Sequence, residues 1–106
     1  MSNKLMGLEE FYKLHESLGP GDVILDVRRA EEFSESHIPK ALNIPVDEVA
    51  NRAAELQRYS KIYIHCKRGG RAKTAYDILS AHGLTNLVCI NDAGMDKWLE
   101  LGYPAE

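Results

Sequence analysis

A cysteine followed directly by a basic, glycine-containing segment is the part of this sequence best suited to chemistry. Cys66 ends a short, mainly apolar stretch, and the next five residues are Lys67, Arg68, Gly69, Gly70 and Arg71. A thiol is nucleophilic only as a thiolate, and nearby cations favour that form. The glycines allow successive main-chain N–H groups to point inward and form an anion-binding concavity. The segment therefore predicts a reactive thiolate beside an anion site.

The elements around this segment would place it at the edge of a sheet. Residues 61–65 read as a strand and residues 72–82 as a helix that stops at Gly83. A helix that starts near Gly70 or Arg71 aims its unpaired N–H groups and the positive end of its dipole at the loop. Ligands of open parallel sheets bind beyond the carboxyl ends of the strands, so the motif and the expected architecture point to one place.

The rest of the chain alternates between strand and helix patterns. Strands are expected at residues 23–27 and 87–90, with an extended segment at 38–45, and helical patterns at 8–18, 30–36, 46–56 and 95–99. No repeat, low-complexity tract or linker interrupts the sequence, which predicts a single domain over residues 1–106. This alternation predicts an α/β fold with a mainly parallel central sheet.

Composition and charge exclude several classes of function. The net charge is −3, whereas a general nucleic-acid binder would normally be basic. The locally cationic loop favours a small anionic ligand over a polyanion. No apolar run approaches the roughly 18 residues of a membrane helix, and residues 1–7 lack the apolar stretch of a secretory signal. We therefore expect a cytoplasmic protein without a membrane or nucleic-acid partner.

The remaining cysteine and the histidines are not expected to be catalytic. Cys89 lies between apolar residues and forms no CxxC pair, so we expect it in the core and expect no disulfide. His65 is adjacent to Cys66 and would point to the opposite face of the sheet, which favours a packed residue over a base. His37 and His82 could approach the thiol only through the fold. The four histidines show no metal-ligand spacing, and no metal site is expected.

Four stretches of the chain resemble the rhodanese (sulfurtransferase) family, in the family's order. They are residues 25–28 with 32–33, residues 36–45, the loop 66–71 with its Cys-x-x-Gly-x-Arg pattern, and residues 88–98 followed by 102–104. Three positions depart from the family's usual glycines, namely Ser36, Lys40 and Ala93. These departures concern the local geometry of loops and leave the cysteine loop intact. The resemblance implies a sheet of about five strands flanked by helices on both faces.

The resemblance also implies a sulfur shuttle that needs no metal or organic cofactor. Cys66 would attack thiosulfate or a related small anionic donor, carry the sulfur as a persulfide, and pass it to cyanide, a small thiol or a protein. Lys67, Arg68 and Arg71 would orient the anion, and the N–H groups of the loop would hold the charged sulfur. Asp26 and Arg28 would support the site rather than react.

These residues are also compatible with two other functions. A phosphatase or arsenate reductase could use the same kind of basic cysteine loop. However, phosphatase loops place five residues between cysteine and arginine, whereas four intervene here, and this loop contains no aspartate to act as a general acid. A non-catalytic binding module of the same fold is the second alternative. Such modules often lack the cysteine, which this chain retains.

Overall fold

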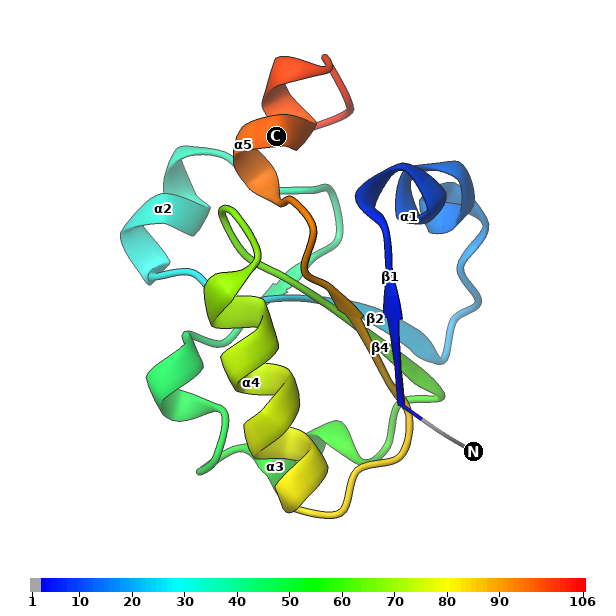
Figure 1. The fold of residues 1–106 in the computed structure, drawn as a ribbon, viewed down its shortest axis with the longest axis vertical. Coiled ribbons are helices and arrows are strands. Elements are labelled where there is room, and N and C mark those ends of the chain that lie inside the picture. The colour runs from blue at the N-terminus through cyan, green and yellow to red at the C-terminus, as the bar shows by residue number, and fades with distance from the viewer. Residues whose placement is uncertain (1–2) are drawn as a thin grey trace.

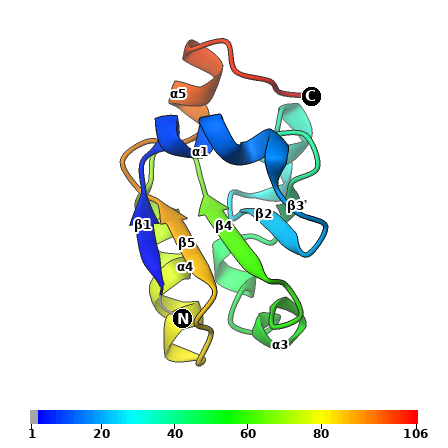
Figure 2. The ribbon, with the colours of Figure 1, turned by 90° about the vertical axis from the view of Figure 1, so that its right-hand side faces the viewer.

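The computed structural model describes residues 3–106, which contain a five-stranded sheet in the order β1-β5-β4-β2-β3 (Figures 1 and 2). The strands are β1 (Lys4–Met6), β2 (Asp22–Asp26), β3 (Leu42–Asn43), β4 (Lys61–His65) and β5 (Leu87–Ile90). Every pairing in the sheet is parallel. The central strand β4 is buried at every position after Lys61 because both of its faces are covered, as is usual for parallel sheets.

Helices cover both faces of the sheet (Figure 1). They are α1 (Leu8–Leu14), α2 (Ala30–Glu35), α3 (Ala53–Leu56), α4 (Gly70–Ala81) and α5 (Met95–Glu100). Side chains of β4 alternate between the two faces: Ile62 and Ile64 pack with α3 and α4, whereas Tyr63 packs with Phe11 of α1 and Trp98 of α5. Among the described residues, no helix is long and apolar enough to cross a bilayer.

The predicted fold class is confirmed, and the differences lie in the short elements. The sequence did not indicate β1, a three-residue edge strand with only Met6 buried, because so few residues show no periodicity. The helical pattern of residues 8–18 ends as an α-helix at Leu14 and continues as the 3₁₀ turn His15–Ser17. The pattern of residues 46–56 splits into the 3₁₀ turn Val46–Glu48 and α3, and both place apolar residues on the same core. Only Leu42–Asn43 of the extended segment pairs with the sheet.

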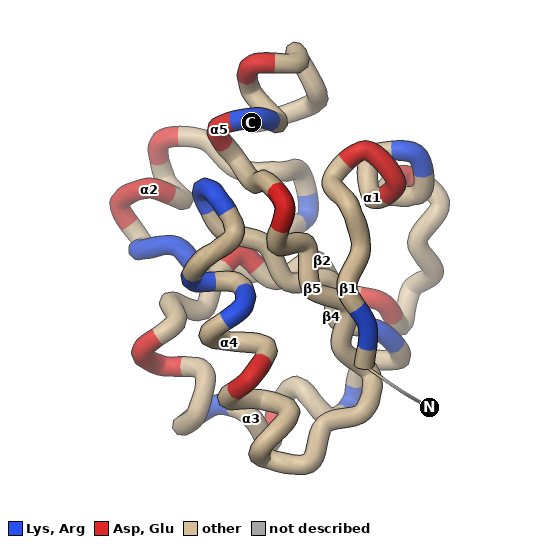
Figure 3. Tube along the Cα trace, viewed as in Figure 1, with Lys and Arg blue, Asp and Glu red and all other residues tan. Residues whose placement is uncertain are grey.

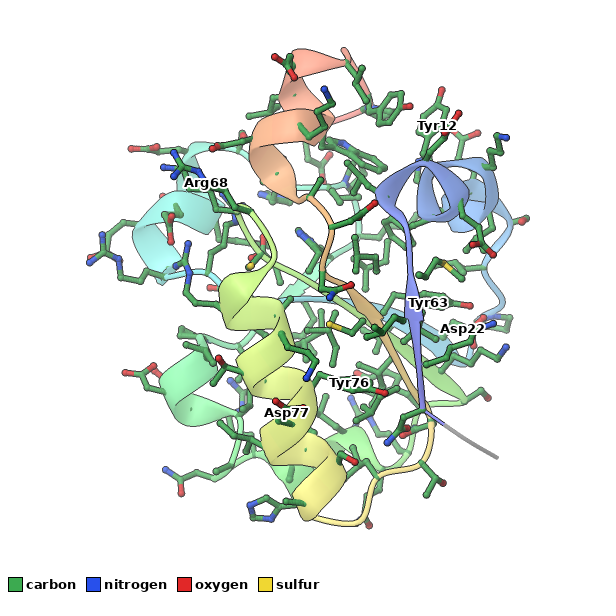
Figure 4. The ribbon with its side chains drawn as sticks, in the orientation of Figure 1. Tyr12, Asp22, Tyr63, Arg68, Tyr76 and Asp77 are labelled. Atoms are coloured by element: carbon green, nitrogen blue, oxygen red, sulfur yellow. The ribbon has the colours of Figure 1, made fainter. Side chains whose placement is uncertain are left out.

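The carboxyl ends of three neighbouring strands bring the loops of the site together. Asp26 at the end of β2 pairs with His65 at the end of β4, and β5 ends at Ile90 on the other side of β4. The segments that follow these three strands therefore meet at one edge of the sheet. The loop that begins at Cys66 lies between α2 and α5, where Figure 4 labels Arg68.

Candidate active site

Cys66 is the first residue after β4, and its thiol faces the beginning of α4. The residue is 1% exposed. Its Sγ accepts main-chain hydrogen bonds from the N–H groups of Gly69 at 3.1 Å and Ala72 at 3.2 Å. Two N–H groups directed at one sulfur stabilise negative charge on it, and the N-terminus of the 12-residue helix α4 adds a favourable dipole. The structure thus brings the predicted cysteine and the predicted helix start together.

Gly69 is the residue that allows the loop to turn its N–H groups inward. Its φ angle of 118° lies in the region that favours glycine. A Cβ atom at this position would also collide with the main-chain carbonyl of Asn91. Glycine is therefore required twice here, by the backbone conformation and by the close approach of the chain after β5.

The carbonyl groups of the same loop are held on its other side by α5. The Cys66 carbonyl accepts a hydrogen bond from the N–H of Met95 at 2.8 Å, and the Lys67 carbonyl accepts one from Asp96 at 3.2 Å. A side chain at Gly94 would clash with the backbone of Cys66 and Lys67. Turning these carbonyls toward α5 leaves the N–H side of the loop for the thiol. The sequence analysis missed this contact, although Gly94 was a signal for a close backbone approach.

Arg71 lies at the mouth of the site in an ion pair with Glu32 of α2. Its Nη1 and Nη2 donate to the two carboxylate oxygens of Glu32 at 2.7 and 3.2 Å. The hydrogen bonds from Arg71 are the main reason why the pKa of Glu32 is lowered from 4.5 to about 2. Glu32 also accepts the N–H of Arg29 at 2.9 Å, so it joins the first turn of α2 to the first turn of α4. This contact joins residues far apart in the sequence and was not predicted.

The other cations of the loop differ in their partners. Arg68 is largely exposed and donates to Asp96 at 3.1 Å. Lys67 is exposed and forms no ion pair with any residue of the described range 3–106. Lys67 therefore supplies the uncompensated positive charge of the loop. Figure 3 shows this basic segment between the acidic residues of α2 and those of α5.

A hollow of about 560 Å³ opens above the thiol. Its lining residues are Cys66, Lys67, Arg68, Gly70, Arg71 and Thr74. All the predicted site residues except Gly69 line it, and Gly69 contributes its N–H to the sulfur. Thr74 was not predicted. It follows Gly70 by one helical turn, and its hydroxyl donates to the Gly70 carbonyl at 3.2 Å.

Asp26 and Arg28 form a buried polar network at the end of β2. Arg28 donates to both carboxylate oxygens of Asp26, at 2.8 to 3.1 Å, and its Nη2 reaches the Ser36 carbonyl at 2.7 Å. The two residues fix the turn after β2 and do not border the thiol hollow.

The other titratable residues lie away from the thiol or are unsuited to react. His65 is buried, and burial lowers its pKa. Its Nδ1 lies 3.4 Å from the Cys66 carbonyl. His37 stacks on Phe33, and His82 lies at the opposite end of α4 from the loop. Burial also raises the pKa of Cys89 to about 12. Within residues 3–106, no group of three or more His, Cys, Asp or Glu side chains is arranged to hold a metal ion.

Comparisons with known proteins agree on one family. A sequence model of the rhodanese-like domain matches residues 8–101. The putative sulfur carrier protein YrkF of Bacillus subtilis is 39% identical over 75 residues, which are 71% of this chain and 40% of YrkF. The thiosulfate sulfurtransferase PspE of Escherichia coli is 32% identical over 65 residues, which are 59% of this chain and 62% of PspE. The crystal structure of a rhodanese-related protein from Thermoplasma volcanium has a TM-score of 0.83, 29% identity and 97% coverage of both chains.

These matches differ in how much of each relative they cover. The chain spans less than two thirds of YrkF and of PspE, whereas it matches the Thermoplasma volcanium chain over almost the full length of both. The family match contains the cysteine loop, Glu32 and the part of α5 that holds the loop. Because the family model matches residues 8–101 and a solved relative has the same fold, the chain belongs to the rhodanese-like domain family.

Proposed function

We propose that this chain is a sulfurtransferase that carries sulfane sulfur as a persulfide on Cys66. The observation that carries the proposal is the pair of main-chain N–H groups, from Gly69 and Ala72, that converge on Sγ. They lie at the base of a hollow whose rim is cationic. This arrangement suits a sulfur that is a thiolate when it attacks the donor and becomes a thiolate again when the acceptor cleaves the persulfide.

In the first step, the Cys66 thiolate attacks the outer sulfur of thiosulfate. A sulfur–sulfur bond forms between Cys66 and that atom, and the bond to the sulfonate sulfur breaks. Sulfite leaves with the electron pair of the broken bond, and the enzyme keeps a persulfide anion. Lys67 attracts the dianion, because its charge is not neutralised by a carboxylate of the described residues.

Main-chain N–H groups at the start of α4 receive the charge that moves to the outer sulfur. Gly70 and Arg71 are the first residues of the helix, and their N–H groups have no helical carbonyl to bind. They border the same hollow as the thiol. In the second step, cyanide or a thiolate attacks the outer sulfur, and the Cys66 thiolate leaves and is ready for another cycle.

Relatives support a sulfur-handling role. YrkF is named a putative sulfur carrier protein, and PspE is named a thiosulfate sulfurtransferase. Because the chain covers only part of each, thiosulfate as donor and cyanide or a thiol as acceptor are part of the proposal. The same holds for a cytoplasmic location.

Electrostatics around the loop disfavour phosphatase chemistry. A phosphatase needs a protonated acid to give a proton to the leaving alcohol. Two carboxylates contact arginines of the loop, and both are engaged in ion pairs, Glu32 with Arg71 and Asp96 with Arg68. The pKa of Glu32, about 2, keeps that group ionised near neutral pH. The loop supplies charge stabilisation without a proton donor, which suits sulfite as a leaving group.

Intact-protein mass spectrometry after incubation with thiosulfate tests the proposal. We expect a gain of one sulfur atom, its removal by cyanide with formation of thiocyanate, and no gain in the Cys66→Ser variant. A folded wild-type protein that takes up no sulfur under these conditions would contradict the proposal, and it would favour a binding module.

A further inference from the structure

The hollow above Cys66 is an incomplete site for a small molecule. Its six lining residues include no large apolar side chain. Sites that recognise small ligands usually enclose them with apolar walls and a few polar groups. The hollow can hold a sulfonate or one sulfur atom, but it offers little to a larger acceptor. An acceptor recognised with any selectivity must therefore contact the surface around the hollow.

Charges around the hollow favour the approach of an acidic partner from one side. Of the four cations near the start of α4, three are paired with carboxylates: Arg68 with Asp96, Arg71 with Glu32 and Lys73 with Asp77. Lys67 is the cation of this group without such a partner among residues 3–106. Both α2 and α5 carry carboxylates (Figure 3). Those of α5 are paired, Asp96 with Arg68 and Glu100 with Lys97, whereas Glu31 and Glu35 of α2 form no ion pair among residues 3–106. An acidic segment that approaches Lys67 therefore meets less repulsion from the side of α5.

An exposed leucine lies on that side. Leu99 is 48% exposed, and it is one of three large hydrophobic side chains exposed in the described part of the chain. It follows Asp96 by three positions, so both lie on one face of α5. Asp96 is bound to Arg68 at 3.1 Å. Leu99 therefore lies about one helical turn from Asp96, whose carboxylate binds Arg68 at the rim of the hollow.

We propose that the sulfur acceptor is a protein segment whose cysteine is flanked by acidic residues and followed by an apolar side chain. It would dock on Lys67, Arg68 and Leu99, which we call the acceptor face. The acidic residues would approach Lys67, the apolar side chain would cover Leu99, and the cysteine thiolate would take the outer sulfur of the Cys66 persulfide. This inference rests on the proposed function, because it needs sulfur on Cys66.

Short cysteine peptides can test the acceptor face. An extended segment advances roughly 3.3 Å per residue, so an apolar side chain about three residues after the cysteine can reach one helical turn beyond the hollow. The first probe has aspartates beside the cysteine and a leucine three residues later. Two matched probes replace the aspartates by lysines or the leucine by serine. The full chain is loaded with sulfur from thiosulfate, freed of donor, and mixed with each probe while the transferred sulfur is followed by mass spectrometry.

We expect the aspartate–leucine probe to accept sulfur roughly tenfold faster than the lysine probe at low salt, with a smaller difference at high salt. Leu99→Ser should slow transfer to this probe roughly three- to tenfold and remove its advantage over the serine probe. Leu101→Ser is the matched control, because Leu101 is 47% exposed but does not share the face of Asp96. Transfer to cyanide should be unchanged in Leu99→Ser.

Several results would overturn the acceptor face. They are equal rates for the three probes, equal effects of Leu99→Ser and Leu101→Ser, or an equal loss of cyanide transfer in Leu99→Ser. A dimer in solution that Leu99→Ser dissociates would assign this face to a second copy of the chain instead. If the protein loads with sulfur and these results follow, the proposed function stands and the docking inference falls. If Cys66 takes up no sulfur at all, both fall.

Discussion

The two cysteines of this chain, one just after β4 and one within the neighbouring β5, border the same core, yet their surroundings differ. Cys66 comes after the last residue of β4, and its sulfur accepts two main-chain N–H groups. Cys89 lies inside β5, where its own N–H and carbonyl belong to the sheet, and burial raises its thiol pKa to about 12. Both residues are almost completely buried. Burial therefore does not separate them; the position relative to the strand end does.

The strand end matters because the main-chain N–H groups there are not used by the sheet and can donate to the side chain. Inside a sheet, N–H groups are used by neighbouring strands, and a thiolate would find no donor. Beyond the sheet, the glycine turn and the first turn of α4 leave N–H groups that must find acceptors, and one acceptor is a sulfur. The same residue type is thus an inert core residue at one site and a candidate nucleophile one strand away.

Removing the nucleophile gives the largest expected effect. Cys66→Ser should lower sulfur transfer from thiosulfate to cyanide by at least about a thousandfold, because serine is not ionised near neutral pH and forms no persulfide. Thiocyanate formation measures the rate, and circular dichroism checks that the variant is folded. Substantial transfer by the folded variant would mean that Cys89 can carry sulfur, and the distinction between the cysteines would be wrong.

Gly69→Ala tests whether the loop backbone makes Cys66 different. The alanine would have to adopt a φ of 118° and would collide with the Asn91 carbonyl. We expect a loss of stability on the order of 1–3 kcal/mol and roughly a hundredfold loss of transfer, because the N–H groups leave the sulfur.

Gly83→Ala is the matched control for this glycine. Gly83 also has a positive φ, 91°, but a Cβ atom there would meet nothing within 4 Å, and it lies at the other end of α4. It should cost on the order of 1 kcal/mol of stability and preserve transfer. Equal losses of transfer in the two variants would show that general destabilisation, rather than the loop, limits the reaction.

Arg71→Ala tests the charge near Cys66. The guanidinium lines the hollow while it is held by Glu32. We expect kcat/KM for thiosulfate to fall roughly tenfold, mainly through KM, and the free energy of unfolding to fall by on the order of 1–2 kcal/mol because the pair with Glu32 is lost. Lys73→Ala removes a cation that is paired with Asp77 and does not line the hollow, and it serves as the control. An unchanged dependence on thiosulfate in Arg71→Ala would exclude Arg71 from donor binding.

Glu32→Gln tests how the site is held together as the pH falls. The pKa of Glu32 is about 2 in the folded protein against 4.5 for a free group. A lowered pKa contributes stability above the unfolded value, and this contribution is lost as the pH falls from about 4.5 to about 2. We expect Glu32→Gln to lower the free energy of unfolding near neutral pH by on the order of 1–2 kcal/mol and to flatten its decline over that range.

Urea unfolding at several pH values measures this contribution. Glu55→Gln is a suitable control, because Glu55 pairs with Arg52 at 2.9 Å on the exposed surface, away from the loop. Arg52 also lowers the pKa of Glu55, but solvent screens this exposed pair, so Glu55→Gln should change the acid dependence much less than Glu32→Gln does. A Glu32→Gln variant with the same acid dependence as the wild type would contradict the role of the Arg71–Glu32 pair.

Cys89→Ser should have the smallest effect on activity. Transfer should stay within about twofold of the wild type, while a buried hydroxyl costs on the order of 1–3 kcal/mol of stability unless it finds a partner. In Cys66→Ser, iodoacetamide at pH 8 should label Cys89 only after unfolding, because the thiol is buried and has a pKa of about 12. Loss of transfer in folded Cys89→Ser would indicate a relay through both cysteines.

Local patterns predicted much of this molecule, and contacts between distant segments account for the rest. Three elements could be predicted from their own residues alone. They are β2 with its β-branched run, the strand before Cys66, and α4 with its alanine-rich face. The N–H groups near the thiol followed from the glycines and the helix start. The helix at residues 95–99 was predicted, but its contacts with the loop carbonyls were not, and neither was the contact of Glu32 with Arg71. These contacts depend on the order of the strands in the sheet.

The contacts between α5 and the cysteine loop have a consequence for the protein during its synthesis. Cys66 leaves the ribosome before the residues that contact its loop, because Asn91, Gly94 and the N–H groups of Met95 and Asp96 come later in the chain. Until β5 pairs with β4 and α5 arrives, nothing orients the loop around the sulfur. The thiol of a nascent chain therefore lacks the loop geometry on which the proposed sulfur transfer depends, and we expect it to react with thiosulfate only after the last helix has packed.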